Sequence, residues 1–183
     1  MLEFLQGRSD AVLFGAQAVN AYVAEVRATQ DVDIASLNGE AFAEELRAYL
    51  STRFHIAVRV REIRDGIGYR IYQVRKPENR HLVDVRPVAI LPPAQRLHGL
   101  LVVEPPELIA NKVAALVARR GKPKSGTDWR DIASLLLRFP ELKTPKGAVR
   151  ERLEAVDAGA AVMAEWQSWA ESNLSPEGDD DGY

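Results

Sequence analysis

The sequence of 183 residues contains no cysteine, which excludes a disulfide scaffold, a thiolate metal site and a cysteine nucleophile. It also lacks any apolar run near the roughly 20 residues that a membrane span requires. The first ten residues carry charges and no apolar core, which is not the pattern of a signal peptide. The net charge of −2 does not indicate a protein that coats nucleic acid or membranes. We therefore expect a soluble cytoplasmic protein with no membrane partner.

The sequence has the composition of a globular protein, with 46% hydrophobic and 27% charged residues. Its first half alternates short segments typical of strands with segments of helical period. The predicted strands are 11–14, 31–35, 56–63, 67–74 and 81–89. The predicted helices are 16–26 and 40–52. The Asp65-Gly66 pair favours a hairpin between the third and fourth of these strands.

The second half shows helical patterns only. The predicted helices are 107–119, 127–138 and 148–173, the last weakly broken at Gly159. Strands followed by helices favour an α+β fold, in which a mixed β-sheet with helices precedes a C-terminal helical bundle. We predict an α/β domain at 1–104, a helical region at 105–174 and an acidic disordered tail at 175–183.

Three aspartates stand out as candidate metal ligands. Asp31 and Asp33 lie two residues apart on a predicted strand, so both side chains project from the same face. Asp84 lies between apolar neighbours in a later predicted strand. Carboxylates that share one face repel each other unless a cation compensates, and Mg²⁺ is the usual partner where phosphates also bind. Acids at a solvated strand end would give the same pattern, so the residues alone leave both interpretations open.

The order of three motifs along the chain favours the interpretation of these acids as metal ligands. The chain has F-G-A-Q-A at 14–18, R-x-T-x-D-x-D at 27–33 and V-D-V at 83–85. This arrangement resembles the nucleotidyltransferase superfamily, and most closely the minimal AbiEii-like nucleotidyltransferases of toxin–antitoxin systems, over roughly residues 11–138. The resemblance implies a nucleotidyltransferase fold. It also implies a Mg²⁺-dependent transfer of a nucleotide monophosphate from an NTP to an unknown hydroxyl acceptor on a protein, an RNA or a small molecule. A toxin would further have an antitoxin protein as its partner.

The resemblance assigns roles to individual residues. It implies that Asp31, Asp33 and Asp84 are catalytic and hold the metal. The residues for which it implies nucleotide binding are Gly15, Ala16, Arg27, Thr29 and Lys112. Position 16 is alanine where the family usually has glycine or serine, and the absent hydroxyl removes one phosphate contact. The alternative is therefore a catalytically degenerate nucleotidyltransferase fold that binds nucleotide or a protein partner.

The polar residues of the second half have competing explanations. Lys112 either reaches a nucleotide phosphate, as the resemblance implies, or extends to solvent beside a core stripe. Asp128 is expected to cap the helix that starts near Thr127, and the role of Asp131 stays open. The basic cluster at 119–124 either faces phosphates or an RNA acceptor, or is a solvated helix end, and we favour the helix end. The three histidines are scattered and are expected to be structural or surface residues.

Overall fold

A computed structural model describes residues 1–64 and 66–175. Contacts divide the chain into two units, Met1–Glu104 and Pro105–Tyr183, which are described separately below. Of the predicted tail, residues 176–183 lie outside the described residues, as does Asp65 of the predicted hairpin turn. None of the helices in the described ranges is both long enough and apolar enough to cross a membrane.

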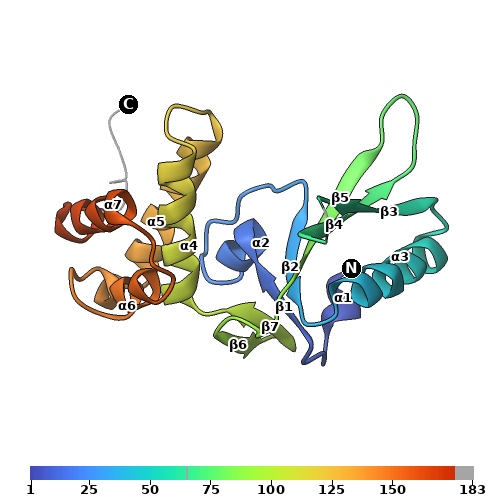
Figure 1. Ribbon diagram of the computed structural model, residues 1–183, viewed down its shortest axis with the longest axis horizontal. Helices are drawn as coiled ribbons and strands as arrows, with labels where there is room; N and C mark the ends of the chain where they lie inside the picture. Colours follow the sequence, from blue (N-terminus) through green and yellow to red (C-terminus); the bar gives the residue numbers. More distant parts are fainter. Residues whose placement is uncertain (65, 176–183) are drawn as a thin grey trace, which may run out of the picture. The chain divides into compact units, whose positions relative to one another are not determined.

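The first unit is built on a mixed sheet of strand order β3-β4-β5-β2-β1-β7-β6 (Figure 1). Its elements are α1 (Leu2–Leu5), β1 (Ala11–Phe14), α2 (Gly15–Asn20), β2 (Val32–Ser36), α3 (Gly39–Phe54), β3 (Val58–Ile63), β4 (Gly68–Gln73), β5 (Arg80–Pro87), β6 (Ala94–Leu97) and β7 (Leu100–Val103). Strand β2 runs parallel to β5 and β1 runs parallel to β7, and the other neighbouring pairs are antiparallel. The predicted α+β class with a mixed sheet is confirmed.

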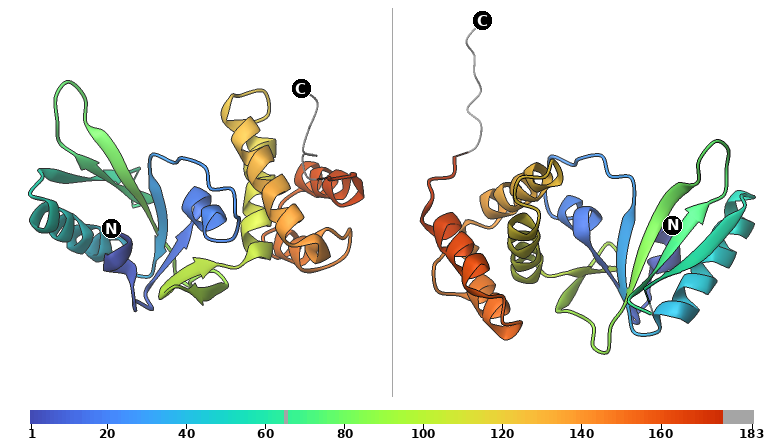
Figure 2. Two further views of the ribbon diagram at one scale, coloured as in Figure 1. Left: turned by 180° about the vertical axis from the view of Figure 1, so that it is seen from behind. Right: turned by 45° about the horizontal axis from the view of Figure 1, so that its top comes forward.

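Helix α3 covers one face of the β3–β4–β5 part of the sheet. Its apolar residues Phe42, Leu46 and Leu50, which are spaced four apart and so form one stripe, are buried. The strands supply Ile71 and Val83 to the same core, and both are fully buried. Figures 1 and 2 show α3 alongside β3 and β4. Because side chains alternate along a strand, the other face of β3 and β4 presents a separate set of residues.

Two local features depart from the sequence-based prediction. The predicted helix 16–26 ends at Asn20, because the Asn20 side chain bonds the backbone of Arg27 in both directions and folds the chain into a loop. The hairpin of β6 and β7 was not predicted. Its turn consists of His98 and Gly99, both with positive φ, and its first strand is an edge with few apolar residues.

The second unit is a helical bundle. Its elements are α4 (Pro105–Ala118), α5 (Lys124–Arg138), the 3₁₀ turn η1 (Pro140–Leu142), α6 (Ala148–Ala155) and α7 (Ala160–Glu171). Helix α4 packs against α5, α6 and α7, and Trp166 of α7 is buried in the core. The helix predicted at 148–173 consists of two helices, and the weak break predicted at Gly159 is a full interruption. Asp157 and Gly159 both have positive φ, and this left-handed backbone separates α6 from α7.

Candidate active site

The strand register gathers the three aspartates of the first unit. Asp33 on β2 lies directly opposite Asp84 on the parallel strand β5, and Asp31 immediately precedes β2. Partners on neighbouring strands point to the same face and lie about 4.8 Å apart in the backbone. Alternation along one strand indicated that Asp31 and Asp33 share a face. The strand order then adds Asp84 to that face.

A histidine joins two of these acids. Asp31, His81 and Asp84 each offer a ligand atom, and these atoms all lie within 4.8 Å of one another. His81 Nδ1 is 3.5 Å from Asp31 Oδ2, and His81 Nε2 is 3.2 Å from Asp84 Oδ1. All three side chains are partly exposed, so a cation can reach them from solvent. The scattered histidines had predicted structural or surface roles, so this placement of His81 was not predicted.

A β-bulge explains why the pattern did not reveal His81. Ile71 of β4 pairs with Val83 of β5, but the next residue, Tyr72, pairs with His81, so Leu82 is an extra residue in β5. Residues three apart on a regular strand face opposite sides of the sheet. The extra residue restores His81 to the face of Asp84, and bulges are known to re-aim side chains next to active sites.

Asp33 lies against the first residue of α2. Gly15 has φ +67°, and a Cβ built on it would be 2.0 Å from Asp33 Oδ2. Only glycine fits at this position, because the contact and the left-handed backbone both exclude a side chain. Ala16 is 8% exposed, so its methyl group packs largely inside the fold. Asp33 is therefore held at the β1–α2 turn, beside the Asp31–His81–Asp84 group.

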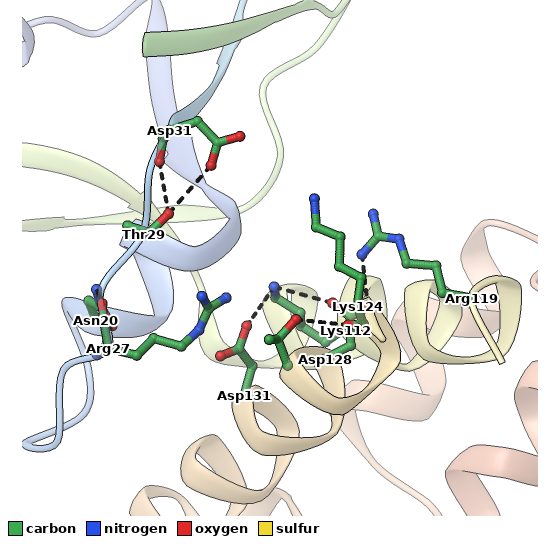
Figure 3. Close-up of polar contacts among 10 residues, drawn as sticks. Asn20, Arg27, Thr29, Asp31, Lys112, Arg119, Lys124, Asp128 and Asp131 are labelled. Carbon is green, nitrogen blue, oxygen red and sulfur yellow. Dashed lines mark hydrogen bonds and ion pairs between the residues drawn. The ribbon is translucent and has the colours of Figure 1, made fainter. Parts of the chain in front are cut away.

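Two other predicted residues shape the chain that leads to β2 (Figure 3). The Thr29 hydroxyl is 3.1 Å from the Asp31 carbonyl oxygen and 3.4 Å from Asp31 Oδ1, so it helps to fix the orientation of Asp31. Asn20 donates to the Arg27 carbonyl at 2.9 Å and accepts from its backbone N–H at 3.1 Å. These contacts fix the backbone positions of Arg27 and Asp31.

An arginine partly balances the charge of the site. Arg70 Nε on β4 donates to Asp84 Oδ1 at 2.9 Å. The hydrogen bond from this guanidinium to Asp84 raises the pKa of Arg70. Asp84 Oδ1 therefore faces both Arg70 and His81.

The second unit holds a buried cluster of ion pairs between α4 and α5 (Figure 3). Lys112 Nζ is 2.7 Å from Asp131 Oδ2 and 3.6 Å from Asp128 Oδ1. Arg119 Nη1 is 2.8 Å from Asp128 Oδ2. Asp128 and Asp131 are only 2% and 1% exposed. Burying charges in this way costs free energy unless they are paired. The cluster therefore either fixes how α4 and α5 pack together or forms part of a functional site.

The cluster corrects two expectations about the second half. Helix α5 begins at Lys124 and Asp128 lies a turn inside it, so the predicted capping role of Asp128 was wrong. In the basic cluster at 119–124, Arg119 pairs with Asp128 and Arg120 pairs with Glu165 at 2.6 Å. Two of its four cations are therefore engaged inside the helical unit.

The residues around Asp84 fit a divalent cation. Carboxylate oxygens suit Mg²⁺ and Mn²⁺, and an imidazole nitrogen adds affinity for later first-row metals. Bonds of about 2.1 Å to adjacent ligands of an octahedral ion put those ligands roughly 3 Å apart. The separations of 3.5 and 3.2 Å involve the two different ring nitrogens of His81, so His81 bridges the two aspartates as it stands. A cation would use one of these nitrogens, and the three ligand atoms lie within 4.8 Å of one another.

Comparisons with known proteins agree on one fold. A family model described as "Nucleotidyl transferase AbiEii toxin, Type IV TA system" matches residues 2–177. The Megavirus polyadenylate synthase has a similar fold, with a TM-score of 0.63 and 12% identity over 76% of this chain and 30% of that one. The chain thus spans about a third of the length of that protein. A candidate nucleotidyltransferase from H. pylori gives a TM-score of 0.53 and 14% identity over 90% and 86% of the two chains. No curated protein matches the sequence.

Proposed function

Because the chain belongs to the AbiEii nucleotidyl transferase toxin family of type IV toxin–antitoxin systems, we propose that it transfers a nucleoside monophosphate from an NTP to a hydroxyl group. The motifs predicted this family, and the family match confirms it. The observation that carries the proposed reaction is the Asp33–Asp84 pair, which the β2–β5 register places beside the Gly15 turn. Clustered acids at that point would suit a divalent cation in a phosphate-binding site.

The proposed reaction is an in-line displacement at the α-phosphate. Asp31, Asp33 and Asp84 would hold a divalent cation such as Mg²⁺, with His81 as an additional donor. When bound, such a cation would supply charge neutralisation at the phosphates and a lower pKa for the acceptor hydroxyl. The acceptor oxygen forms a bond to the α-phosphorus, and the bond from that phosphorus to pyrophosphate breaks. Asp84 accepts the proton that the acceptor hydroxyl loses.

The remaining predicted residues are proposed to bind the nucleotide. The triphosphate would lie over the turn of Gly15 and Ala16, although Ala16 itself is only 8% exposed. Helix α2 has only six residues, so its dipole contributes little and cationic side chains matter more. Arg27 is the proposed phosphate ligand. Lys112 lies in the second unit, where it pairs with Asp131 and Asp128, and its phosphate role stays a prediction from the resemblance. Thr29 would act by orienting Asp31.

The proposal includes a cellular setting. A toxin of this family is expected in the cytoplasm, where NTP and Mg²⁺ are present, with an antitoxin protein as its partner. Co-purification of the tagged chain with the product of an adjacent gene would test the partner.

The enzymatic proposal is tested with α-labelled NTPs, Mg²⁺ or Mn²⁺, and three acceptor pools of protein, RNA and small metabolites. We expect labelling by the wild type and at least a hundredfold loss, about 2.7 kcal/mol of transition-state stabilisation, in Asp33→Asn. Glu151→Gln is the matched control, since it removes one exposed carboxylate from α6. Equal labelling by the wild type and Asp33→Asn would contradict the proposal.

The second candidate function is that of a degenerate fold that binds nucleotide without turnover. The alanine at position 16 favours it, because the hydroxyl of a serine there is absent. Calorimetry with Mg²⁺ and each NTP separates the two. Nucleotide binding that Asp33→Asn abolishes, without labelling of any acceptor pool, would support the binding module. The absence of any nucleotide binding would leave a protein-binding role.

A further inference from the structure

The helical unit has a pocket of its own, formed by α5 and α7, which are labelled in Figure 1. Its volume is about 180 Å³, and it is partly open to solvent. Helix α5 contributes Trp129, while α7 and its C-cap contribute Glu165, Ser168, Trp169 and Ser172. The residues of α7 are spaced three or four apart, so they share one face of that helix. The pocket therefore belongs wholly to the second unit.

The aromatic part of the pocket consists of two stacked indoles. Trp169 is 5% exposed and is held in the core of the bundle, whereas Trp129 is 53% exposed. Their ring centroids are 5.5 Å apart. Trp169 thus supports an indole whose remaining surface faces water. The face of an indole ring carries a negative electrostatic potential and attracts organic cations.

The charge of the pocket is negative. Among the residues that line it, Glu165 is the only one with an ionisable side chain. Its Oε2 accepts a hydrogen bond from Arg120 Nη2 at 2.6 Å. The Glu165 carboxylate therefore already accepts one guanidinium group. The Arg120 side chain is 69% exposed, and an ion pair to a side chain so exposed is weak enough for another cation to displace it.

Helix α7 adds to this negative potential. It contains two acidic residues and no basic one. The pocket reaches its C-terminal end, where the helix macrodipole favours cations. Lys143 Nζ donates to the carbonyl oxygens of Ala170 and Ser172, so one ammonium group already binds at this helix end.

We propose that the pocket binds an organic cation, namely a guanidinium or alkylammonium group on a short apolar stem. The charged group pairs with Glu165, and the ligand lies against the exposed face of Trp129. An anion would meet the carboxylate and the negative helix end, and a neutral ligand would gain only the indole contact. This binding site goes beyond the proposed nucleotidyl transfer and uses none of the residues assigned to it.

The test is an NMR titration of the isotope-labelled full-length chain, in which each of the three tryptophans gives one indole N–H signal. The probe is butylguanidinium, and the control is butylurea, which has nearly the same shape and no charge. We expect butylguanidinium to shift the Trp129 and Trp169 signals saturably, with a Kd on the order of 1 mM. Trp166 is 1% exposed and does not line the pocket, so its signal is the internal reference.

Two variants move the affinity in opposite directions. Glu165→Gln should weaken butylguanidinium binding at least about threefold, because it removes the only charge of the pocket. Arg120→Ala should strengthen it about twofold or more, because it frees the carboxylate, and misfolding would not produce such a gain. Glu154→Gln is the matched control, since it also removes an acid that pairs with an arginine, Arg150 on α6. Circular dichroism checks that each variant folds.

Three results would each overturn the proposal. One is binding of butylurea as tight as that of butylguanidinium. Another is equal weakening by Glu165→Gln and Glu154→Gln. The third is Arg120→Ala with no gain in affinity. None of these results depends on whether the chain transfers nucleotides.

Two further ligands identify the source of the cation. Agmatine represents a free metabolite, and arginine with both backbone ends blocked represents a side chain of another protein. Tighter binding of agmatine supports a free organic cation as the ligand, and tighter binding of the blocked arginine supports a protein side chain. If neither shifts the Trp129 signal, the proposal fails.

Discussion

At the scale of single residues, His81 distinguishes this site from a purely carboxylate one. Its imidazole lies between Asp31 and Asp84, at 3.5 and 3.2 Å. Magnesium prefers oxygen ligands, whereas cobalt, nickel and zinc gain from an imidazole nitrogen. The donor set therefore predicts a site that accepts Mg²⁺ but binds a later transition metal more tightly.

We predict that His81→Ala weakens Co²⁺ binding about tenfold, or 1.4 kcal/mol, and changes Mg²⁺ binding by less than about threefold. Isothermal titration calorimetry of each ion measures both affinities without any need for turnover. His98→Asn is the control, because it removes an imidazole from the β6–β7 turn and asparagine tolerates the positive φ there. A loss of Co²⁺ affinity in His98→Asn as large as that in His81→Ala would contradict the assignment.

At the scale of elements, the ion pairs between α4 and α5 contrast with those on the surface. Lys112 is 11% exposed beside two buried aspartates, whereas the Arg120 side chain that pairs with Glu165 is 69% exposed. Removing one partner of a buried pair leaves a desolvated charge and costs about 3–5 kcal/mol, against about 0–1 kcal/mol for an exposed pair. The α4–α5 contact should therefore depend on Lys112.

We predict that Lys112→Met lowers the free energy of unfolding by several kcal/mol, and that Arg120→Ala lowers it by about 1 kcal/mol or less. In a double-mutant cycle, Lys112→Met and Asp131→Asn should show a coupling energy of about 1–3 kcal/mol. Urea unfolding followed by tryptophan fluorescence measures each term. The prediction fails if Lys112→Met is no more destabilising than Arg120→Ala.

Element-scale features also decide how much of the site the sequence could predict. The D-x-D alternation indicated that Asp31 and Asp33 share a face, and the buried stripe of α3 followed from its helical spacing. The β2–β5 register, which aligns Asp33 with Asp84, is a long-range pairing that no local pattern encodes. The bulge at Leu82 inserts one residue into β5 and so moves His81 to the same face of the sheet as Asp84. A strict two-residue period does not predict that face.

At the scale of the whole molecule, each of the two units has a core of its own. The first has buried residues such as Ile34, Leu46 and Val83, and the second has Ile132, Leu136 and Trp166. Units with separate cores are expected to unfold as separate cooperative steps. All three tryptophans of the sequence, Trp129, Trp166 and Trp169, lie in the second unit, so tryptophan fluorescence reports on the helical bundle alone.

This separation predicts different transitions for different probes. Far-UV circular dichroism should follow both units through urea unfolding, while tryptophan fluorescence follows only the bundle. Gly15→Ala places a side chain against Asp33 at a positive φ, so it should shift the circular dichroism curve and leave the fluorescence midpoint unchanged. Lys112→Met should shift the fluorescence midpoint. If the circular dichroism and fluorescence curves instead coincide, and each variant shifts both of them equally, the two units unfold as one cooperative body.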